Sequence, residues 1–334
     1  MKKILITGGA GFIGYHLTKA LCKKNYVTIL DNFSRGKMDK YLRELKLKKN
    51  VEIISYDLNK KINLKKKFDF IFHLAATVGV KNVIKKPVFT LENNILPSLN
   101  LINHILTNNK NCRFIFFSTS EVYSPIIKLK KKVFPLKEDY NLLIPNDITK
   151  RDSYFVSKLF IENFLKISGI KFIIYRPHNI YGPRMGKSHV IPELIEKIVL
   201  KNKKKIKIFS PTHKRVFCYI DDCIQQILGS YDKKKNINCI LNLGSKQKEI
   251  TMFQLAKLIN KISNKNKKII KGKNTPGSPY RRVPSVKKIY INLKNYNELK
   301  LVDGIIKTMK WYSDEKYNWT IFNKYRKKIL IKCF

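Results

Sequence analysis

Three glycines at a spacing of three follow the first apolar run of the chain. Residues 4–6 read ILI, and Gly8, Gly11 and Gly14 come just after them. Glycines at these places permit a tight turn, let backbone N–H groups approach a pyrophosphate, and let a helix pack closely on a strand. A helix that begins near Gly11 would also point its unpaired N–H groups and the positive end of its dipole at that anion. The segment therefore predicts a strand, a turn and a helix that bind a dinucleotide.

A carboxylate ends the second expected strand. The run 26–31 finishes at Asp31, about twenty residues after the glycines, where an acid can bind the ribose hydroxyls of NAD. Because Asp31 would repel a 2′-phosphate, we expect NAD rather than NADP, although Arg35 could bind that phosphate. The strand–turn–helix context disfavours the alternative, a glycine-rich turn in an unrelated α/β protein.

Apolar runs alternate with helix-length segments through the first half of the chain. This rhythm predicts an α/β fold of the Rossmann type, a doubly wound parallel sheet with helices on both faces. The strands are expected over 3–7, 26–31, 51–55, 68–73, 112–118 and 170–175.

After residue 176 the rhythm changes, because prolines punctuate shorter elements. The change predicts a smaller C-terminal substrate-binding lobe. We expect an NAD-binding domain over 1–175 plus about 214–243, the smaller lobe over 176–213 and 244–320, and a basic tail over 321–334.

The net charge of +46 raises the hypothesis of a nucleic-acid partner. However, the lysine runs fall between apolar segments and lack interleaved aromatic residues, as in the residue usage of an AT-rich genome. No specific nucleic-acid partner is therefore expected, although a positive field should attract anionic substrates. A polyanion-binding protein remains an alternative.

Cysteines and apolar runs limit the other classes of protein. The six cysteines form no C-x-x-C pair, so neither a metal site nor a disulfide framework is expected. No apolar run reaches the length of about eighteen residues that a membrane span needs. The lysines and apolar run at the start imitate a secretory signal, but its removal would destroy the glycine turn. A cytoplasmic protein is expected.

Tyr154 and Lys158 are four residues apart in a helical pattern and so share one helix face. The lysine charge would lower the pKa of the phenol, and Tyr154 could then act as a base near neutral pH. This spacing is common, and it becomes informative only downstream of a dinucleotide motif.

A strand end rich in hydroxyl groups precedes this pair. Residues 116–123 read FFSTSEVY, and their hydroxyls could bind a sugar hydroxyl while Tyr154 removes its proton. Glu121 adds a carboxylate that could move a second proton. The alternative for Glu121 is a surface acid that caps the next helix.

Together these motifs resemble the extended short-chain dehydrogenase/reductase family, in its nucleotide-sugar epimerase, dehydratase and decarboxylase branch. The resemblance covers about residues 2–312. Besides the glycine turn, the strand end and the Tyr154/Lys158 pair, it rests on DL at 57–58, HLAA at 73–76, RPHNIYGPR at 176–184, RVFCYIDD at 215–222 and RRVP at 281–284.

The resemblance implies the site residues. The catalytic set is Tyr154, Lys158, Thr119, Ser120 and Glu121. The implied NAD contacts are Gly8, Gly11, Phe12, Ile13, Gly14, Asp31, Asn32, Arg35, Asp57, Leu58, Leu74, Ala75, Ala76, Ser118, Tyr154, Lys158 and Pro177. The implied contacts of a nucleotide-diphosphate sugar are Asn179, Val190, Arg215 and Arg282. A homodimer through a helix pair that includes 154–167 is also implied.

The resemblance leaves the reaction open. All branches begin with oxidation at C4, which gives a 4-keto sugar. The Thr-Ser-Glu strand end and the downstream Arg-x-Pro-Ser are most similar to UDP-glucuronate decarboxylases, which suggests a role in polysaccharide or lipopolysaccharide sugar synthesis. A dehydratase, a 4-epimerase similar to UDP-glucose 4-epimerase, and a non-catalytic NAD-binding regulator are the alternatives.

Overall fold

The computed structural model describes residues 1–129, 133–201, 203–293 and 295–314, so the basic tail expected over 321–334 lies outside the described residues. The chain divides into two compact units. The first contains Met1–His178, Asp221–Gly244 and Pro284–Tyr296. The second contains Asn179–Ile220, Ser245–Val283 and residues 297–314. Compared with the expected boundaries, the first unit includes the additional segment Pro284–Tyr296, whereas residues 214–220 belong to the second unit.

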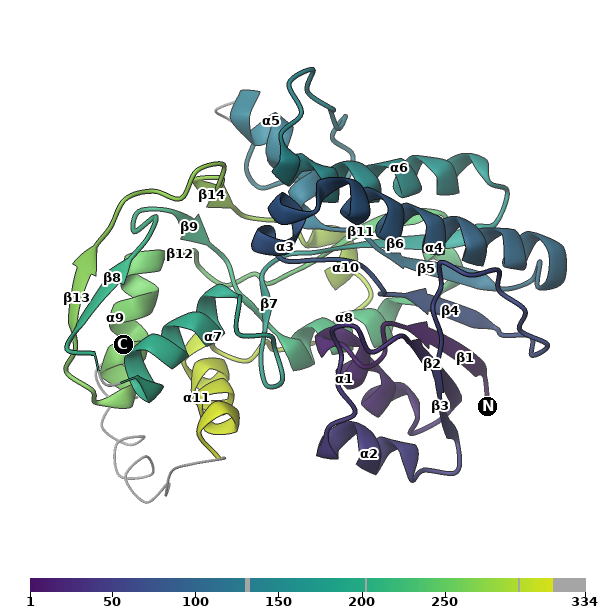
Figure 1. Ribbon diagram of the computed structural model, residues 1–334, viewed down its shortest axis with the longest axis horizontal. Helices are drawn as coiled ribbons and strands as arrows, with labels where there is room; N and C mark the ends of the chain where they lie inside the picture. The colour runs from purple at the N-terminus through teal and green to yellow at the C-terminus, as the bar shows by residue number, and fades with distance from the viewer. Residues whose placement is uncertain (130–132, 202, 294, 315–334) are drawn as a thin grey trace. The chain divides into compact units, whose positions relative to one another are not determined.

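The first unit is built on a parallel sheet of seven strands (Figure 1). Every neighbouring pair is parallel. The strands, in their order across the sheet, are β11 (Cys239–Leu243), β6 (Lys171–Pro177), β5 (Arg113–Phe117), β4 (Phe70–His73), β1 (Lys3–Thr7), β2 (Tyr26–Asp31) and β3 (Val51–Ser55).

This order confirms the Rossmann-type fold class. The six strands predicted from the sequence are all present, within two residues of their expected ends. The strand order reverses between β1 and β4, and ligands of such sheets bind at the carboxyl ends of the strands beside this reversal.

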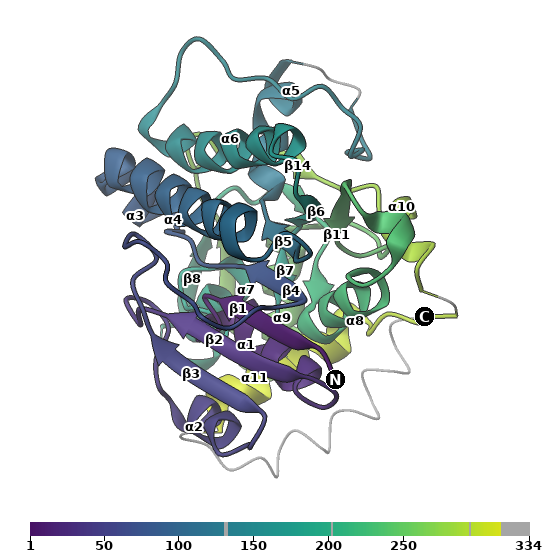
Figure 2. The ribbon, with the colours of Figure 1, turned by 90° about the vertical axis from the view of Figure 1, so that its right-hand side faces the viewer.

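Helices cover both faces of this sheet, as Figure 2 shows, with α4 and α6 on one face and α1 and α8 on the other. The helices of the first unit are α1 (Phe12–Leu21), α2 (Lys40–Lys46), α3 (Val80–Lys85), α4 (Pro87–Asn108), α5 (Ser124–Leu129), α6 (Ser153–Ile167), α8 (Ile220–Ser230, from Asp221 on) and α10 (Lys287–Tyr290). Short 3-10 turns are η1 (Ser120–Tyr123), η2 (Lys150–Asp152) and η4 (Lys234–Asn236).

One apolar core lies between the sheet and the pair α4 and α6. Ile161 and Leu165, one helical turn apart on α6, are both buried there. Phe114 and Phe116 alternate along β5 and are completely buried in the same core. Full burial of each such side chain contributes roughly 1.5–3 kcal/mol, so this core fixes α6 over β5.

The second unit is built from shorter elements. Its strand pairs are β7 (Ile180–Tyr181) with β10 (Cys218–Tyr219), and β8 (Lys205–Ile208) with β13 (Lys268–Lys271). A three-stranded sheet contains β12 (Ile250–Thr251), β9 (Lys214–Arg215) and β14 (Arg281–Arg282). Its helices are α7 (Val190–Ile195), continued by the π-helical turn η3 (Glu196–Leu200), α9 (Met252–Ser263) and α11 (Leu301–Ser313).

No helix within the described ranges is long and apolar enough to cross a membrane.

Candidate active site

The glycine turn leaves room only for backbone. Gly8 has a φ of +69°, in the left-handed region that glycine adopts at little cost. A Cβ added to Gly8 would lie 2.7 Å from the Ala75 nitrogen, and one added to Gly14 would lie 2.4 Å from the Gly8 carbonyl oxygen. The turn between β1 and α1 is therefore a cradle that any larger side chain would fill. Its shape, with the start of α1 behind it, fits a bound pyrophosphate.

Asp31 links the end of β2 to this turn by hydrogen bonds. Its carboxylate accepts the Ala10 N–H at 3.0 Å and the Phe33 N–H at 2.8 Å. The side chain is buried, so the negative charge has a fixed position at the carboxyl end of β2. Contact of Asp31 with a ribose stays a prediction.

The remaining predicted cofactor residues lie in loops that follow neighbouring strands. Asp57, after β3, accepts the backbone and side-chain N–H groups of Asn59. The loop after β4 is tied to α4, because the Thr77 N–H donates to Asn94 at 2.7 Å. Asn94 in turn donates to Ser157 on α6 at 3.1 Å. The loop that contains Leu74, Ala75 and Ala76 is thus linked to the helix that carries Tyr154.

Tyr154 is surrounded by groups from three other segments. The pKa of the Tyr154 phenol is raised above its ordinary value, mainly by burial and then by the nearby Glu121 charge, although a hydrogen bond with Thr119 and the Arg35 charge oppose this rise. Thr119 and Glu121 come from the end of β5, and Arg35 comes from the loop after β2. The sequence had linked Arg35 only with the cofactor, but the structure also brings it near the phenol. These neighbours suit a tyrosine that exchanges a proton with a bound hydroxyl.

Lys158 is buried one turn along α6 from Tyr154. Burial lowers the pKa of Lys158 to about 7, against the opposing effect of Glu162. Its Nζ lies 4.7 Å from the centre of the Phe116 ring. A lysine with a pKa so far below its ordinary value changes charge near neutral pH, and such lysines are frequent at sites of proton transfer.

The strand end holds its hydroxyls in different ways. The Thr119 hydroxyl accepts the Glu121 N–H at 3.2 Å and so caps η1. Ser120 is buried, and the Ser118 hydroxyl donates to Glu162. The Glu121 carboxylate lies 3.8 Å from the Arg151 guanidinium, with both side chains about one-fifth exposed (19% and 18%).

Sequence reasoning missed Arg151 and Glu162. Arg151 lies three residues before Tyr154, which is one helical turn, and this spacing was an available signal. Glu162 lies four residues after Lys158 in an otherwise apolar stretch of α6. A lone acid on a buried face of a helix was the corresponding signal there.

Within the second unit, two predicted substrate residues are neighbours. Arg282 on β14 is the register partner of Arg215 on β9. The Asn179 side chain donates to the Val216 carbonyl at 2.9 Å, next to Arg215 in the chain. Val190 is the first residue of α7 and is 41% exposed. The unit therefore brings Arg215 and Arg282 together, and it fixes Asn179 beside the same strand.

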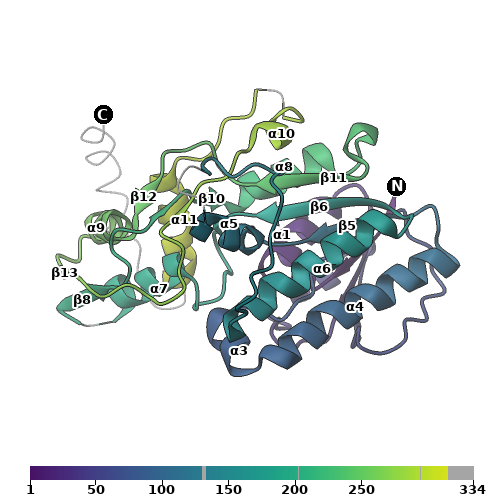
Figure 3. The same cartoon turned by 90° about the horizontal axis from the view of Figure 1, so that it is seen from above.

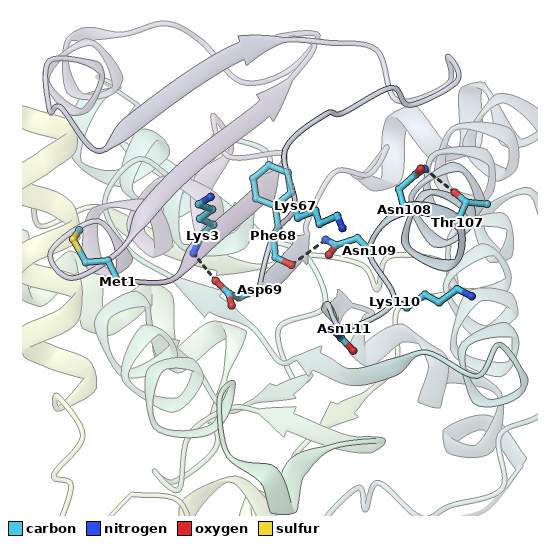
Figure 4. A pocket seen from close by; sticks show the side chains of 10 residues that line it. All are labelled: Met1, Lys3, Lys67, Phe68, Asp69, Thr107, Asn108, Asn109, Lys110 and Asn111. Carbon is cyan, nitrogen blue, oxygen red and sulfur yellow. Dashed lines mark hydrogen bonds between the residues drawn. The ribbon is translucent and has the colours of Figure 1, made fainter.

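A pocket of about 640 Å³ lies away from these residues (Figure 4). It is lined in part by Lys3, Asp69 and Asn109, and the Asp69 carboxylate accepts the Lys3 N–H at 2.8 Å. Lys3 is the first residue of β1, so this pocket opens at the amino ends of the strands. The predicted site residues of the first unit lie at the opposite, carboxyl ends.

Comparisons with known proteins agree on one family. The model of the NAD dependent epimerase/dehydratase family matches residues 4–244. A UDP-N-acetyl-alpha-D-glucosaminuronate decarboxylase of Bacillus cytotoxicus is 32% identical over 329 residues, which cover 94% of this chain and 98% of that protein. A putative UDP-glucose 4-epimerase of Methanocaldococcus jannaschii is 30% identical, over 92% of this chain and 97% of that protein.

A similar solved structure is the UDP-glucuronic acid 4-epimerase of Bacillus cereus in complex with UDP-glucuronic acid and NAD. It has a TM-score of 0.79 and 27% sequence identity, and the match covers 94% of this chain and 99% of that one.

Proposed function

Since this chain belongs to the NAD dependent epimerase/dehydratase family, and is thus a nucleotide-sugar modifying enzyme, we propose that it removes carbon dioxide or water from its substrate by way of a 4-keto sugar. The reaction that we propose first is a decarboxylation of the UDP-glucuronate type. Its product would serve the synthesis of surface polysaccharide or lipopolysaccharide.

NAD is the cofactor of this family, and the glycine cradle with the start of α1 fits its pyrophosphate. When bound, NAD supplies a reversible oxidation at C4 of the sugar. The proposed contacts of the chain lie at the carboxyl ends of β1, β2, β3, β4, β5 and β6, together with Tyr154 and Lys158 on α6.

In this proposal Tyr154 takes the proton of the C4 hydroxyl, while the Thr119 hydroxyl orients the sugar. Lys158 supplies positive charge behind the phenol, which favours its ionised form. Arg215 and Arg282 bind the diphosphate, because a planar guanidinium can grip phosphate oxygens in pairs. Ser120 would contribute a second hydroxyl to the sugar.

Glu121 is the group that distinguishes the reactions. In a decarboxylation the 4-ketone accepts the electron pair of the C5–C6 bond, carbon dioxide leaves, and C5 then takes up a proton. In a dehydration a proton leaves C5 and the C6 oxygen departs as water. Both need a group that moves a second proton near Tyr154, and the proximity of Glu121 to the phenol is the observation that carries this proposal.

A 4-epimerase is the second candidate, because the solved structure that we describe is a 4-epimerase. That reaction needs Tyr154 and a rotation of the sugar, but no second acid. A non-catalytic NAD-binding regulator would show no turnover at all.

The first experiment identifies the reaction. The protein is incubated with NAD and a panel of UDP-, dTDP-, GDP- and CDP-sugars, and the products are identified by mass. Loss of carbon dioxide or of water supports the proposal. An unchanged mass with an altered sugar supports the epimerase.

The second experiment tests Glu121 directly. Glu121→Gln keeps the shape and removes the charge, so the first oxidation should still occur while product formation stalls. Rapid mixing measures the appearance of NADH, and the product yield is measured beside it. Asp139→Asn, which changes an exposed acid of the same unit, is the control. Unaltered product formation by Glu121→Gln would contradict the proposed reaction.

We also propose a homodimer through α4 and α6. These helices lie side by side (Figure 3) and expose several apolar side chains: Val88, Phe89, Leu96, Phe160 and Ile167. Phe160→Glu should convert dimer to monomer in sedimentation velocity, because a charge would have to be buried in the interface. The control is Phe209→Glu, at an exposed phenylalanine of the second unit. A monomeric wild-type protein would end this proposal.

A further inference from the structure

A buried carboxylate lies on the helix that carries Tyr154 and Lys158, and the proposed reaction does not use it. Glu162 follows Lys158 by four residues and Tyr154 by eight, so the three share one face of α6. Its exposed fraction is 0%. A charge is almost never buried so completely unless it is paired, so its partners are informative.

The partners of Glu162 come from the carboxyl ends of two neighbouring strands. Its carboxylate accepts the Ser118 hydroxyl after β5, and it accepts Arg176 on β6 through Nε at 3.0 Å and Nη2 at 2.5 Å. Arg176 is itself 1% exposed. This two-pronged, charge-assisted contact is geometrically restrictive, so it holds α6 at one position over β5 and β6.

The other guanidinium nitrogen extends this link across the sheet. Arg176 Nη1 donates to the Tyr123 hydroxyl at 2.8 Å and to the Glu138 carbonyl at 3.3 Å. The Tyr123 hydroxyl donates to Asn242 on β11 at 3.0 Å. The position of Glu162 is therefore set by three adjacent strands rather than by its own helix alone.

Lys158 faces groups of different charge on each side. Tyr154 lies on the same helix, and the Phe116 ring lies on β5. His73 on β4 interacts with Lys158, and burial lowers the pKa of this histidine well below its ordinary value, which leaves it neutral. Glu162 is the negative group that opposes the effect of burial on Lys158. Arg176, the partner of Glu162, adds a further positive charge behind it.

We propose that Glu162 is a positioning residue of the reaction, which holds α6 on the strand ends and keeps Lys158 in the charged form that Tyr154 requires. This inference rests on the proposed roles of Tyr154 and Lys158.

Glu162→Gln should change the pH dependence of the enzyme in a specific way. Without this negative charge the pKa of Lys158 falls further, because burial is no longer opposed. At low pH Lys158 is charged in both proteins, and their rates should be similar. As the pH rises, Lys158 loses its proton at a lower pH in the variant than in the wild type. The rate of the variant therefore reaches its plateau at a lower pH, and the plateau rate is lower.

The test uses two measurements on the full-length protein. The first follows turnover of UDP-glucuronic acid with NAD between pH 5 and pH 9, at roughly one-unit steps on either side of neutrality. The second follows the proton of Lys158 directly, through the pH dependence of lysine side-chain carbon signals in NMR, with Lys158→Met to assign its signal, and needs no substrate. In Glu162→Gln we expect Lys158 to lose its proton at a pH roughly one unit lower, since no negative charge then opposes the effect of burial.

Two further variants separate this role from a general loss of stability. Glu162→Asp restores the charge and should recover the wild-type shape of the pH profile. Tyr175→Phe removes a buried hydrogen bond of 2.6 Å to Ser230, from the residue before Arg176, and should leave both measurements unchanged. If Glu162→Gln alone does not fold, Glu162→Gln with Arg176→Met removes both buried charges and should show the same direction of change.

The outcomes are distinct. A rate lowered by one constant factor at every pH, with an unchanged Lys158 titration, means that Glu162 only supports the fold and overturns the inference. If UDP-glucuronic acid is not turned over, the proposed reaction fails for that sugar, while the Lys158 titration still decides the role of Glu162.

Discussion

The two units of the chain hold their site residues in different ways. In the first, Tyr154 and Lys158 are surrounded by buried groups, and their protonation depends on that surrounding. In the second, Arg215 and Arg282 stand side by side on strands of two residues. A guanidinium keeps its charge in any such setting. The first arrangement therefore suits proton transfer, whereas the second suits the binding of an anion.

The largest effect is expected when the Tyr154 phenol of the first unit is removed. Tyr154→Phe should lower turnover by roughly 10²–10⁴, the usual contribution of a general base, and leave NAD affinity nearly unchanged. Steady-state rates and a cofactor titration measure both quantities. Tyr26→Phe, at an exposed tyrosine, is the control. Near wild-type turnover would show that proton transfer does not depend on this helix.

A substitution in the second unit should weaken the binding of the nucleotide sugar and leave the turnover number nearly unchanged. Arg282→Gln should raise the KM for the nucleotide sugar by roughly 10- to 100-fold, because a hydrogen bond to a charged group contributes about 1.5–3 kcal/mol. The turnover number should change little. Arg43→Gln, on the exposed side of α2, controls for the loss of one positive charge. A fall in turnover at constant KM would reverse the roles assigned to the units.

The smallest effects are expected from substitutions at the starts of two helices, one in each unit. Thr251 caps α9 of the second unit, and its side chain accepts the Gln254 N–H at 3.1 Å. Thr149 precedes α6 of the first unit, and its hydroxyl donates to Asp152 at 2.6 Å. Each change to alanine should cost about 1 kcal/mol of unfolding free energy.

Only Thr149→Ala should also lower turnover, because it loosens the start of the helix that carries Tyr154. Denaturant unfolding and steady-state rates distinguish the two variants. Equal rates in both would show that the start of α6 does not position the phenol.

The sequence predicted the first unit better than the second for a physical reason. Strands buried on both faces give apolar runs long enough to recognise, as 112–118 and 170–175 did. Two-residue strands such as β9 and β14 are too short to show an apolar run or an alternation of apolar and polar residues. The segment Pro284–Tyr296 was assigned to the smaller lobe, because a short helix that begins with Lys287 and Lys288 looks like a solvated loop.

The candidate site could likewise be predicted only in part from the sequence. Tyr154 and Lys158 were found because their relation is local to one helix. Glu162 was not found, and Arg176 was noted only as part of the motif at 176–184, because their contacts involve strands that lie far apart in the sequence. Arg35 was linked only with the cofactor, since nothing in its neighbours along the chain indicates that it lies near Tyr154.

The order in which the chain is synthesised differs from the order in which its first unit is completed. Asn242 donates to the carbonyls of Leu136 and Ser285, and the Ser285 N–H donates to Leu136. The ribosome delivers residues 245–283, all of them in the other unit, before Ser285 emerges. A nascent chain thus holds all seven strands of the sheet before the segment that binds Asn242 and Leu136 exists. Completion of the first unit is consequently a late event of translation, even though its first strand begins at Lys3.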